Sequence, residues 1–71
     1  MMMTNAAKEL ATEYLRLGGH RLLVMDDNLL STNSWEPDPP EAESFWNERI
    51  ETLSLRRRNE VMSFLPSINA V

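Results

Sequence analysis

Apolar residues recur at helical spacing near the start of the chain. This first stripe consists of Ala7, Leu10, Ala11, Tyr14 and Leu17. Residues three and four apart share one face of an α-helix, so the spacing predicts an amphipathic helix over residues 5–17. Thr4 or Asn5 can cap its free amides, and Gly18 can adopt the left-handed conformation that ends many helices.

A second apolar stripe follows a group of prolines. Asp38 can cap the new helix, Pro39 suits its first position, and Glu41 can complete a capping box. The apolar positions that follow are Ala42, Phe45, Trp46, Ile50 and Leu53. We therefore expect a helix over residues 40–52 with a polar opposite face.

The pattern changes phase after Leu53. Leu55 cannot share its face, because two residues along a helix rotate by about 200°. This predicts a third helix over residues 55–65, which Ser54 caps and Pro66 ends. Its buried side would consist of Leu55, Val61, Met62, Phe64 and Leu65. The alternative is one continuous helix with an irregular stripe.

Residues 20–33 allow several interpretations, because the apolar run at residues 22–25 is too short for periodicity to assign. The run could be a strand that turns at residues 26–28 and pairs with residues 29–33 as a hairpin. It could also be a short helix, which leucine and methionine favour. We expect an extended segment, then a turn or short helix around residues 27–30. A lone strand would need the edge of a second subunit.

A polar, proline-rich connector occupies residues 31–40. Proline removes backbone donors and biases the preceding residue toward extended geometry, so regular structure is not expected there. Trp35 is its one large apolar residue. We expect Trp35 to cover the core as a lid, because the chain has few large apolar side chains; an exposed Trp35 would instead anchor a partner.

These elements predict a mainly α fold, a small three-helix domain with an irregular or briefly extended segment between the first two helices. The single domain would span residues 1–71, with frayed ends at 1–4 and 67–71. The expected core comprises Leu10, Tyr14, Leu17, Leu23, Trp35, Phe45, Trp46, Ile50, Leu53, Val61, Phe64 and Leu65.

Length and composition limit how this domain can be stabilised. The chain has 71 residues and no cysteine, so neither a disulfide nor a thiolate-bound metal can staple a small core. Self-association as a homodimer would add stability. The chain contains no apolar run of about 20 residues, and its N-terminus lacks the pattern of a signal peptide. We therefore expect a cytoplasmic protein that does not contact a membrane.

The negative charge is concentrated in the middle of the chain. The net charge is -4, yet residues 26–51 hold eight acidic residues and only one basic residue, Arg49. Such asymmetry favours a basic protein surface as the partner. The expected partner-binding residues are Glu43, Glu48, Glu51 and Trp35. An inhibitor-like or antitoxin-like regulator or adaptor would suit these properties.

A basic cluster, Arg56, Arg57 and Arg58, falls in the first turn of the third helix, where the helix macrodipole disfavours cations. Ion pairs with Glu48, Glu51 or Glu60 would compensate. The alternative is a DNA-binding module similar in layout to a helix-turn-helix, with Arg56, Arg57, Arg58 and Asn59 contacting nucleic acid. The net negative charge of the chain and the acidic residues of the preceding helix weaken this alternative, because both would repel the phosphates of DNA.

Catalytic signals are weak. His20 with Asp26 and Asp27 is the one grouping with metal-binding or acid–base potential, and it lacks the second histidine that a zinc site normally supplies. The two glycines form neither a phosphate-binding loop nor a nucleophile elbow. We therefore expect a non-enzymatic protein without a cofactor or a metal.

Overall fold

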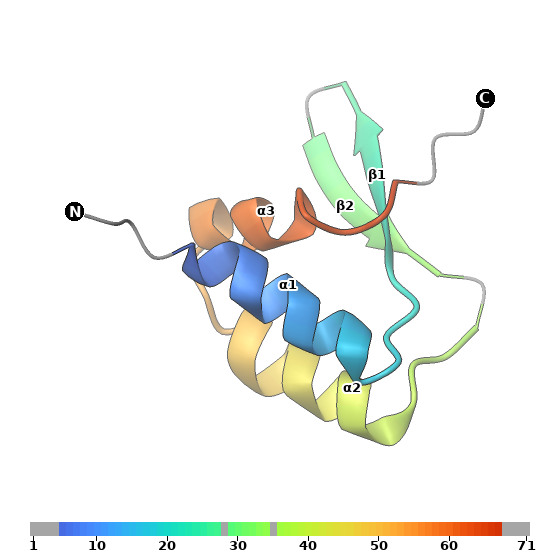
Figure 1. Cartoon of the computed structure of the whole chain (residues 1–71). Helices are drawn as coiled ribbons and strands as arrows, with labels where there is room; N and C mark the ends of the chain where they lie inside the picture. Colours follow the sequence, from blue (N-terminus) through green and yellow to red (C-terminus); the bar gives the residue numbers. More distant parts are fainter. Residues whose placement is uncertain (1–4, 28, 35, 68–71) are drawn as a thin grey trace.

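A computed structural model describes residues 5–27, 29–34 and 36–67 of the chain. In chain order the elements are α1 (Ala6–Arg16), β1 (Leu22–Asp26), β2 (Leu29–Asn33), α2 (Pro40–Phe45), η1 (Trp46–Ile50) and α3 (Leu55–Met62). The η1 segment is a π-helical turn that continues α2. Helix α1 packs against both α2 and α3, and the two strands project beside α3 (Figure 1).

The prediction of a mainly α, three-helix domain is wrong, because β1 and β2 pair as an antiparallel hairpin and the fold is α+β. Leu22 lies opposite Asn33 at one end of the hairpin, and Asp26 lies opposite Leu29 at the other. Asp27 follows β1 with a positive φ of 51°. The hairpin alternative is therefore confirmed. The alternative of a short helix around residues 27–30 is wrong, and residues 31–33 belong to β2 rather than to the connector.

The hairpin forms because its alternate residues meet the helical core. Leu23 and Leu30 lie on the same face of the sheet, since side chains alternate along each strand and directly opposite residues share a face. Both leucines pack against the core. Burial alternates along β2, whereas Leu22, Leu23 and Val24 of β1 are all half-buried. Neither the pattern of the apolar run nor its residue types therefore reveal a strand.

The ends of α1 follow the local signals in the sequence. The Asn5 side chain accepts a hydrogen bond from the Lys8 N–H (3.2 Å), as an N-cap does. At the other end, Gly18 has a φ of 94°. The N–H groups of Gly18 and Gly19 donate to the carbonyl oxygens of Leu15 and Tyr14 at 2.9 and 3.2 Å. This is a Schellman motif, which satisfies carbonyls at the end of the helix.

Helix α2 begins at Pro40 without the expected Asp38 cap. Pro39 holds the cap position and makes no side-chain hydrogen bond there. The helix then widens into η1, where the Glu51 N–H donates to the Trp46 carbonyl oxygen (2.8 Å). In an α-helix, side chains spaced four residues apart are rotated about the helix axis by about 40° relative to each other. The wider π turn offsets this rotation. The regular helix ends at Ile50 rather than at residue 52.

Helix α3 is shorter than predicted. Ser54 caps it as expected, with its Oγ accepting from the Arg57 N–H (3.3 Å). The helix ends at Met62, before the predicted residue 65, and the following turn leaves Phe64 42% exposed instead of in the core. The chain then passes beside β1, where the Pro66 carbonyl oxygen accepts from the Leu23 N–H (2.7 Å).

Ser67 forms a parallel bridge with Leu23, so the described chain is paired up to this residue. The predicted frayed residues 1–4 and 68–71, like Trp35 with its predicted lid role, lie outside the described residues.

The core lies where α1 meets the other helices. Among the described residues it comprises Ala11, Tyr14, Ala42, Trp46, Ile50, Val61, Met62 and Leu65. The rings of Tyr14 and Trp46 meet edge to face, with centroids 5.0 Å apart and planes at 63°. Of the remaining predicted core residues, those packed partly buried around this cluster are Leu10, Leu17, Leu23, Phe45 and Leu53. Two alanines, buried on the touching helices α1 and α2, were not predicted to be core.

Candidate functional site

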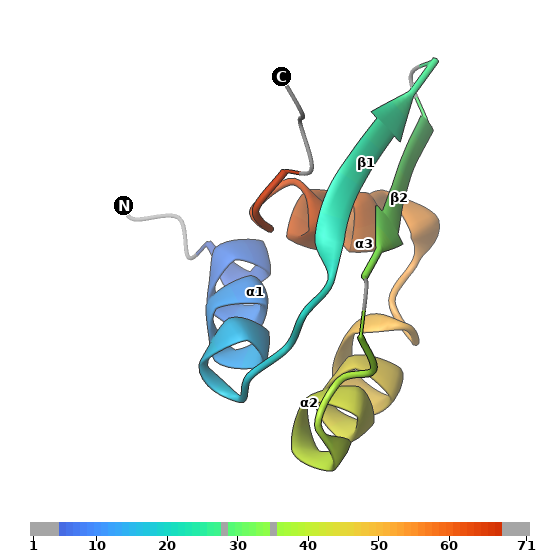
Figure 2. The ribbon, with the colours of Figure 1, turned by 90° about the vertical axis from the view of Figure 1, so that its right-hand side faces the viewer.

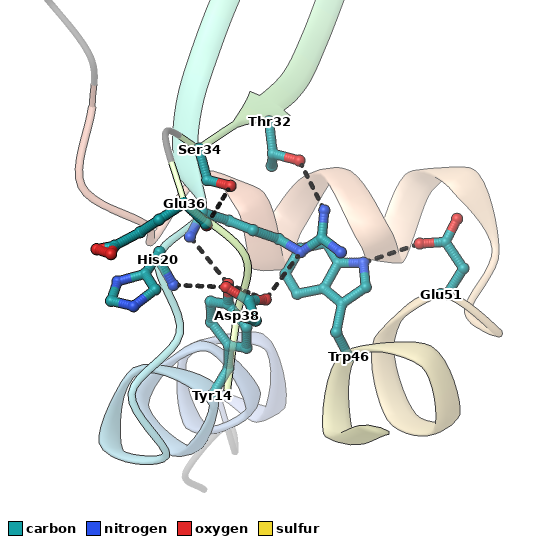
Figure 3. Close-up of polar contacts among 9 residues, drawn as sticks. Tyr14, His20, Thr32, Ser34, Glu36, Asp38, Trp46 and Glu51 are labelled. Carbon is teal, nitrogen blue, oxygen red and sulfur yellow. Dashed lines mark hydrogen bonds and ion pairs between the residues drawn. The ribbon is translucent and has the colours of Figure 1, made fainter. Parts of the chain in front are cut away.

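Asp38 joins three parts of the chain at the base of the hairpin (Figure 3). Its side chain is only 5% exposed. One carboxylate oxygen, Oδ2, accepts from the Tyr14 hydroxyl (2.8 Å), and Oδ1 accepts from the backbone N–H of His20 (2.8 Å). The Tyr14 hydroxyl accepts in turn from the Arg21 backbone N–H (2.9 Å). Asp38 therefore holds the connector against α1 and the approach to β1.

Arg21 extends this network to η1 and the hairpin. Its Nε lies 3.6 Å from Asp38 Oδ2, and its guanidinium carbon lies 4.4 Å from the centre of the Trp46 ring. Its terminal nitrogen donates to Thr32 Oγ1 on β2 (3.4 Å). The guanidinium group thus touches the connector, the π turn and the sheet. Sequence reasoning missed this network, because its hydrogen bonds join residues up to 24 positions apart.

The network is suited to holding the fold together rather than to acid–base chemistry. Burial, followed by the hydrogen bond to Asp38, raises the pKa of Tyr14 well above its ordinary value of 10.0. Tyr14 therefore keeps its proton at neutral pH and cannot act as a base. A hollow of about 190 Å³ lies beside Arg21, Asp38 and Glu43. Pockets that enclose small molecules are usually larger, about 300 Å³ or more.

The residues weighed as a metal site are not brought together. The His20 backbone joins the network at the base of the hairpin, whereas Asp26 and Asp27 lie exposed near its far end. Six residues of extended chain span about 20 Å, too far for one ion to be shared. Within residues 5–27, 29–34 and 36–67, no three His, Asp or Glu side chains gather as metal ligands.

The predicted acidic residues differ in their surroundings. Glu51 is engaged: its Oε1 accepts from Trp46 Nε1 (2.8 Å), and its Oε2 lies 3.4 Å from an Arg58 nitrogen. Glu43 and Glu48 are both exposed. Glu41 is exposed as well. These three carboxylates lie at different positions around the helix formed by α2 and η1, and we refer to Glu41, Glu43 and Glu48 together as the α2 acidic face.

The basic cluster is divided by the fold. Arg58 forms an ion pair with Glu51, as predicted, and Asn59 is half-buried. Arg56 and Arg57 are exposed and line an open groove of about 730 Å³ between α3 and the start of α1. Glu60 and Phe64 also line this groove. The four residues of the predicted nucleic-acid site therefore do not share one exposed surface.

Comparison with protein-family models, with curated proteins and with solved structures found no match. In the part of the chain that the structure describes, no helix combines the length and apolar character needed to cross a membrane.

Proposed function

We propose that this chain is a small, non-enzymatic regulator or adaptor of the cytosol that binds a basic protein surface through the α2 acidic face. One observation carries the proposal. The carboxylates of Glu41, Glu43 and Glu48 are exposed, and none of the ion pairs found among the described residues includes them. They remain available to the cations of a partner.

Three other acidic residues are compensated by ion pairs within the chain. Glu13 pairs with Arg16, Asp38 with Arg21, and Glu51 with Arg58. The nearby Arg49 lies over the Phe45 ring, 5.6 Å from its centre. Three carboxylates without an ion pair to any described residue, on one short helix, give this surface a negative charge, and such a surface accelerates encounter with a positively charged protein. An inhibitor-like or antitoxin-like partner of a basic protein would use a surface of this kind.

The test compares two variants with the same change in net charge. The first carries Glu41→Gln, Glu43→Gln and Glu48→Gln; the matched control carries Glu9→Gln, Glu36→Gln and Glu60→Gln, all exposed positions off this face. Proteins captured from native lysate by each variant are quantified at rising salt concentrations. We expect the first variant to lose basic proteins that the wild type and the control retain, and we expect salt to weaken the retained binding.

Two outcomes would refute the proposal. Equal loss in both variants would indicate non-specific attraction to net charge, and equal retention would place the contact on another surface. A gel-shift assay with duplex DNA, using Arg56→Ala with Arg57→Ala, addresses the alternative directly. DNA binding that falls with salt and disappears in this variant would favour the nucleic-acid function over the one proposed.

A further inference from the structure

The hairpin has one covered edge and one open edge. On the β1 side, residues 66–67 pair with Leu23. On the β2 side, none of the hydrogen bonds among the described residues goes to a further strand. Figure 2 shows β2 as the outer strand of the hairpin, with α3 crossing behind its lower end. An open edge presents unpaired backbone donors and acceptors to any chain that can align with it.

The ladder identifies the backbone groups that point outward from this edge. The Leu23 N–H donates to Pro66, so it points away from β2. Directly opposite residues of an antiparallel ladder share the same orientation, and the orientation alternates along each strand. Leu23 lies opposite Thr32, and Met25 lies opposite Leu30. The N–H and C=O groups of Leu30 and Thr32 therefore point outward from β2.

The open edge lacks two of the features that often prevent strand addition, charged residues and proline. Natural edge strands carry charged residues or proline, which block pairing with another chain. The five residues of β2, Leu29–Asn33, include neither. Leu29 is moreover 71% exposed. This leucine provides apolar surface beside the edge.

We propose that the β2 edge pairs with the β2 edge of a second copy of this chain, forming a four-stranded antiparallel sheet across a two-fold axis. In one register, every residue that pairs across the axis lies within β2 of its own copy. Leu30 lies opposite Thr32 of the second copy, and Ser31 lies opposite Ser31 of the second copy on the axis. Both outward-pointing residues of each copy are then hydrogen-bonded, which gives four new backbone hydrogen bonds.

A second copy fits this edge because the two outward-pointing residues of β2, Leu30 and Thr32, pair with each other across the two-fold axis. The paired β2 strands carry no charged residue, so they bring no like charges together. An interface of two short strands and a few leucines belongs to the small, weak class, below about 1,200 Å², so the dimer is expected to depend on concentration.

A single introduced cysteine tests the register, because the chain has no cysteine of its own. Residues opposite each other in a non-hydrogen-bonded antiparallel pair have Cα atoms about 4.5 Å apart, which a disulfide can span. We expect Ser31→Cys to form a covalent dimer under mild oxidation at least tenfold faster than Ser44→Cys. Ser44 is an exposed serine on α2, far from the hairpin in sequence, and serves as the matched control.

Sedimentation velocity provides the second measurement. We expect the wild type to self-associate as its concentration rises toward about 1 mM. A dimer dissociation constant of this size corresponds to a favourable binding free energy of only about 4 kcal/mol. Ser31→Lys places two cations opposite each other on the axis and should raise the dimer dissociation constant at least tenfold. Ser44→Lys makes the same charge change and should leave it unaltered. Circular dichroism verifies that each variant is folded.

Three results would overturn the proposal: a wild type that stays monomeric at about 1 mM, equal cross-linking of the two cysteine variants, or a dimer that Ser31→Lys does not weaken. If Ser31→Lys fails to fold, the cysteine comparison still decides. The hairpin edge is separate from the α2 acidic face, so failure of the dimer and failure of the proposed partner binding are distinguishable.

Discussion

Tyr14 is the single tyrosine of the chain, and its hydroxyl group lies inside the Asp38 network. The residue is fully buried, it donates to a carboxylate, and it accepts a backbone N–H from Arg21. Burial disfavours the phenolate most, and the negative charge of Asp38 disfavours it further, so the pKa of Tyr14 lies well above 10.0. Ionisation of this one group is therefore coupled to folding.

We expect Tyr14 to ionise only as the protein unfolds in alkali. The unfolded chain releases the proton at its ordinary pKa of 10.0, whereas the folded chain retains it. The contribution to stability is therefore complete below pH 10 and decreases above it by about 1.4 kcal/mol per pH unit. Tyrosinate absorbance and circular dichroism should change together in an alkaline titration.

The control for this titration is Tyr14→Phe, which lacks the ionisable group. Its stability, although lower at neutral pH because the Arg21 N–H and Asp38 each lose a partner, should depend less steeply on pH above 10.0. Tyrosinate absorbance that rises near pH 10 in a protein with unchanged circular dichroism would contradict the coupling.

Single-residue roles could be predicted where the partner is local in sequence. Asn5, Gly18 and Ser54 each act on backbone groups within a few positions, and all three predicted caps are confirmed. Asp38 carries the same local signal for a cap. Its actual partners lie 18 and 24 residues away, and a buried tyrosine hydroxyl competes better for its carboxylate than the exposed amides of α2 do. No local pattern contains that information.

At the scale of elements, periodicity placed the helices but not the hairpin. The stripes of α1 and α2 begin within a residue of the predicted positions, since many residues contribute to each. The hairpin has five residues per strand, and its leucines and methionine favour no single structure. Its formation depends on core contacts of Leu23 and Leu30. The π turn was likewise not predictable, because it corrects a drift that appears only once the helices pack.

The end of α1 contains two adjacent glycines that are required for different reasons. Gly18 needs its left-handed backbone, with a φ of 94°. Gly19 needs space instead, because a Cβ atom there would lie 2.0 Å from a ring carbon of Tyr14. That ring is fully buried and cannot move aside. The glycine backbone therefore forms one wall of the tyrosine pocket.

We expect Gly19→Ala to destabilise the protein more than Gly18→Ala. The strained backbone of Gly18→Ala should lower the free energy of unfolding by about 1–2 kcal/mol. Overpacking against the ring in Gly19→Ala should lower it by about 3 kcal/mol or more. Urea denaturation of the two variants measures both values. The opposite order would show that the tyrosine ring is free to shift.

At the scale of the whole molecule, the helices and the hairpin are joined by few side chains. Arg21 is the one described residue that contacts the connector, the Trp46 ring and β2 together. The arrangement of hairpin on helices could not be predicted, because an arginine beside a short apolar run carries no signal for three distant partners. The buried alanines Ala11 and Ala42 fall on the predicted apolar stripes, but the stripes do not show that these two helices contact each other there.

We expect Arg21→Ala to loosen the hairpin before it unfolds the helices. The variant loses a cation–π contact and an ion pair to a buried carboxylate, together about 1–3 kcal/mol. Arg21→Lys should restore only part of this, because an ammonium group lacks the planar surface that stacks on Trp46.

The control is Arg49→Ala, whose exposed stacking on Phe45 should contribute less than about 0.5 kcal/mol. Native-state hydrogen exchange tests the order of opening: the amides of β1 and β2 should lose protection by about tenfold or more while those of α1 change less. Equal loss across both would mean that the hairpin and the helices unfold as one unit, with Arg21 stabilising that unit as a whole.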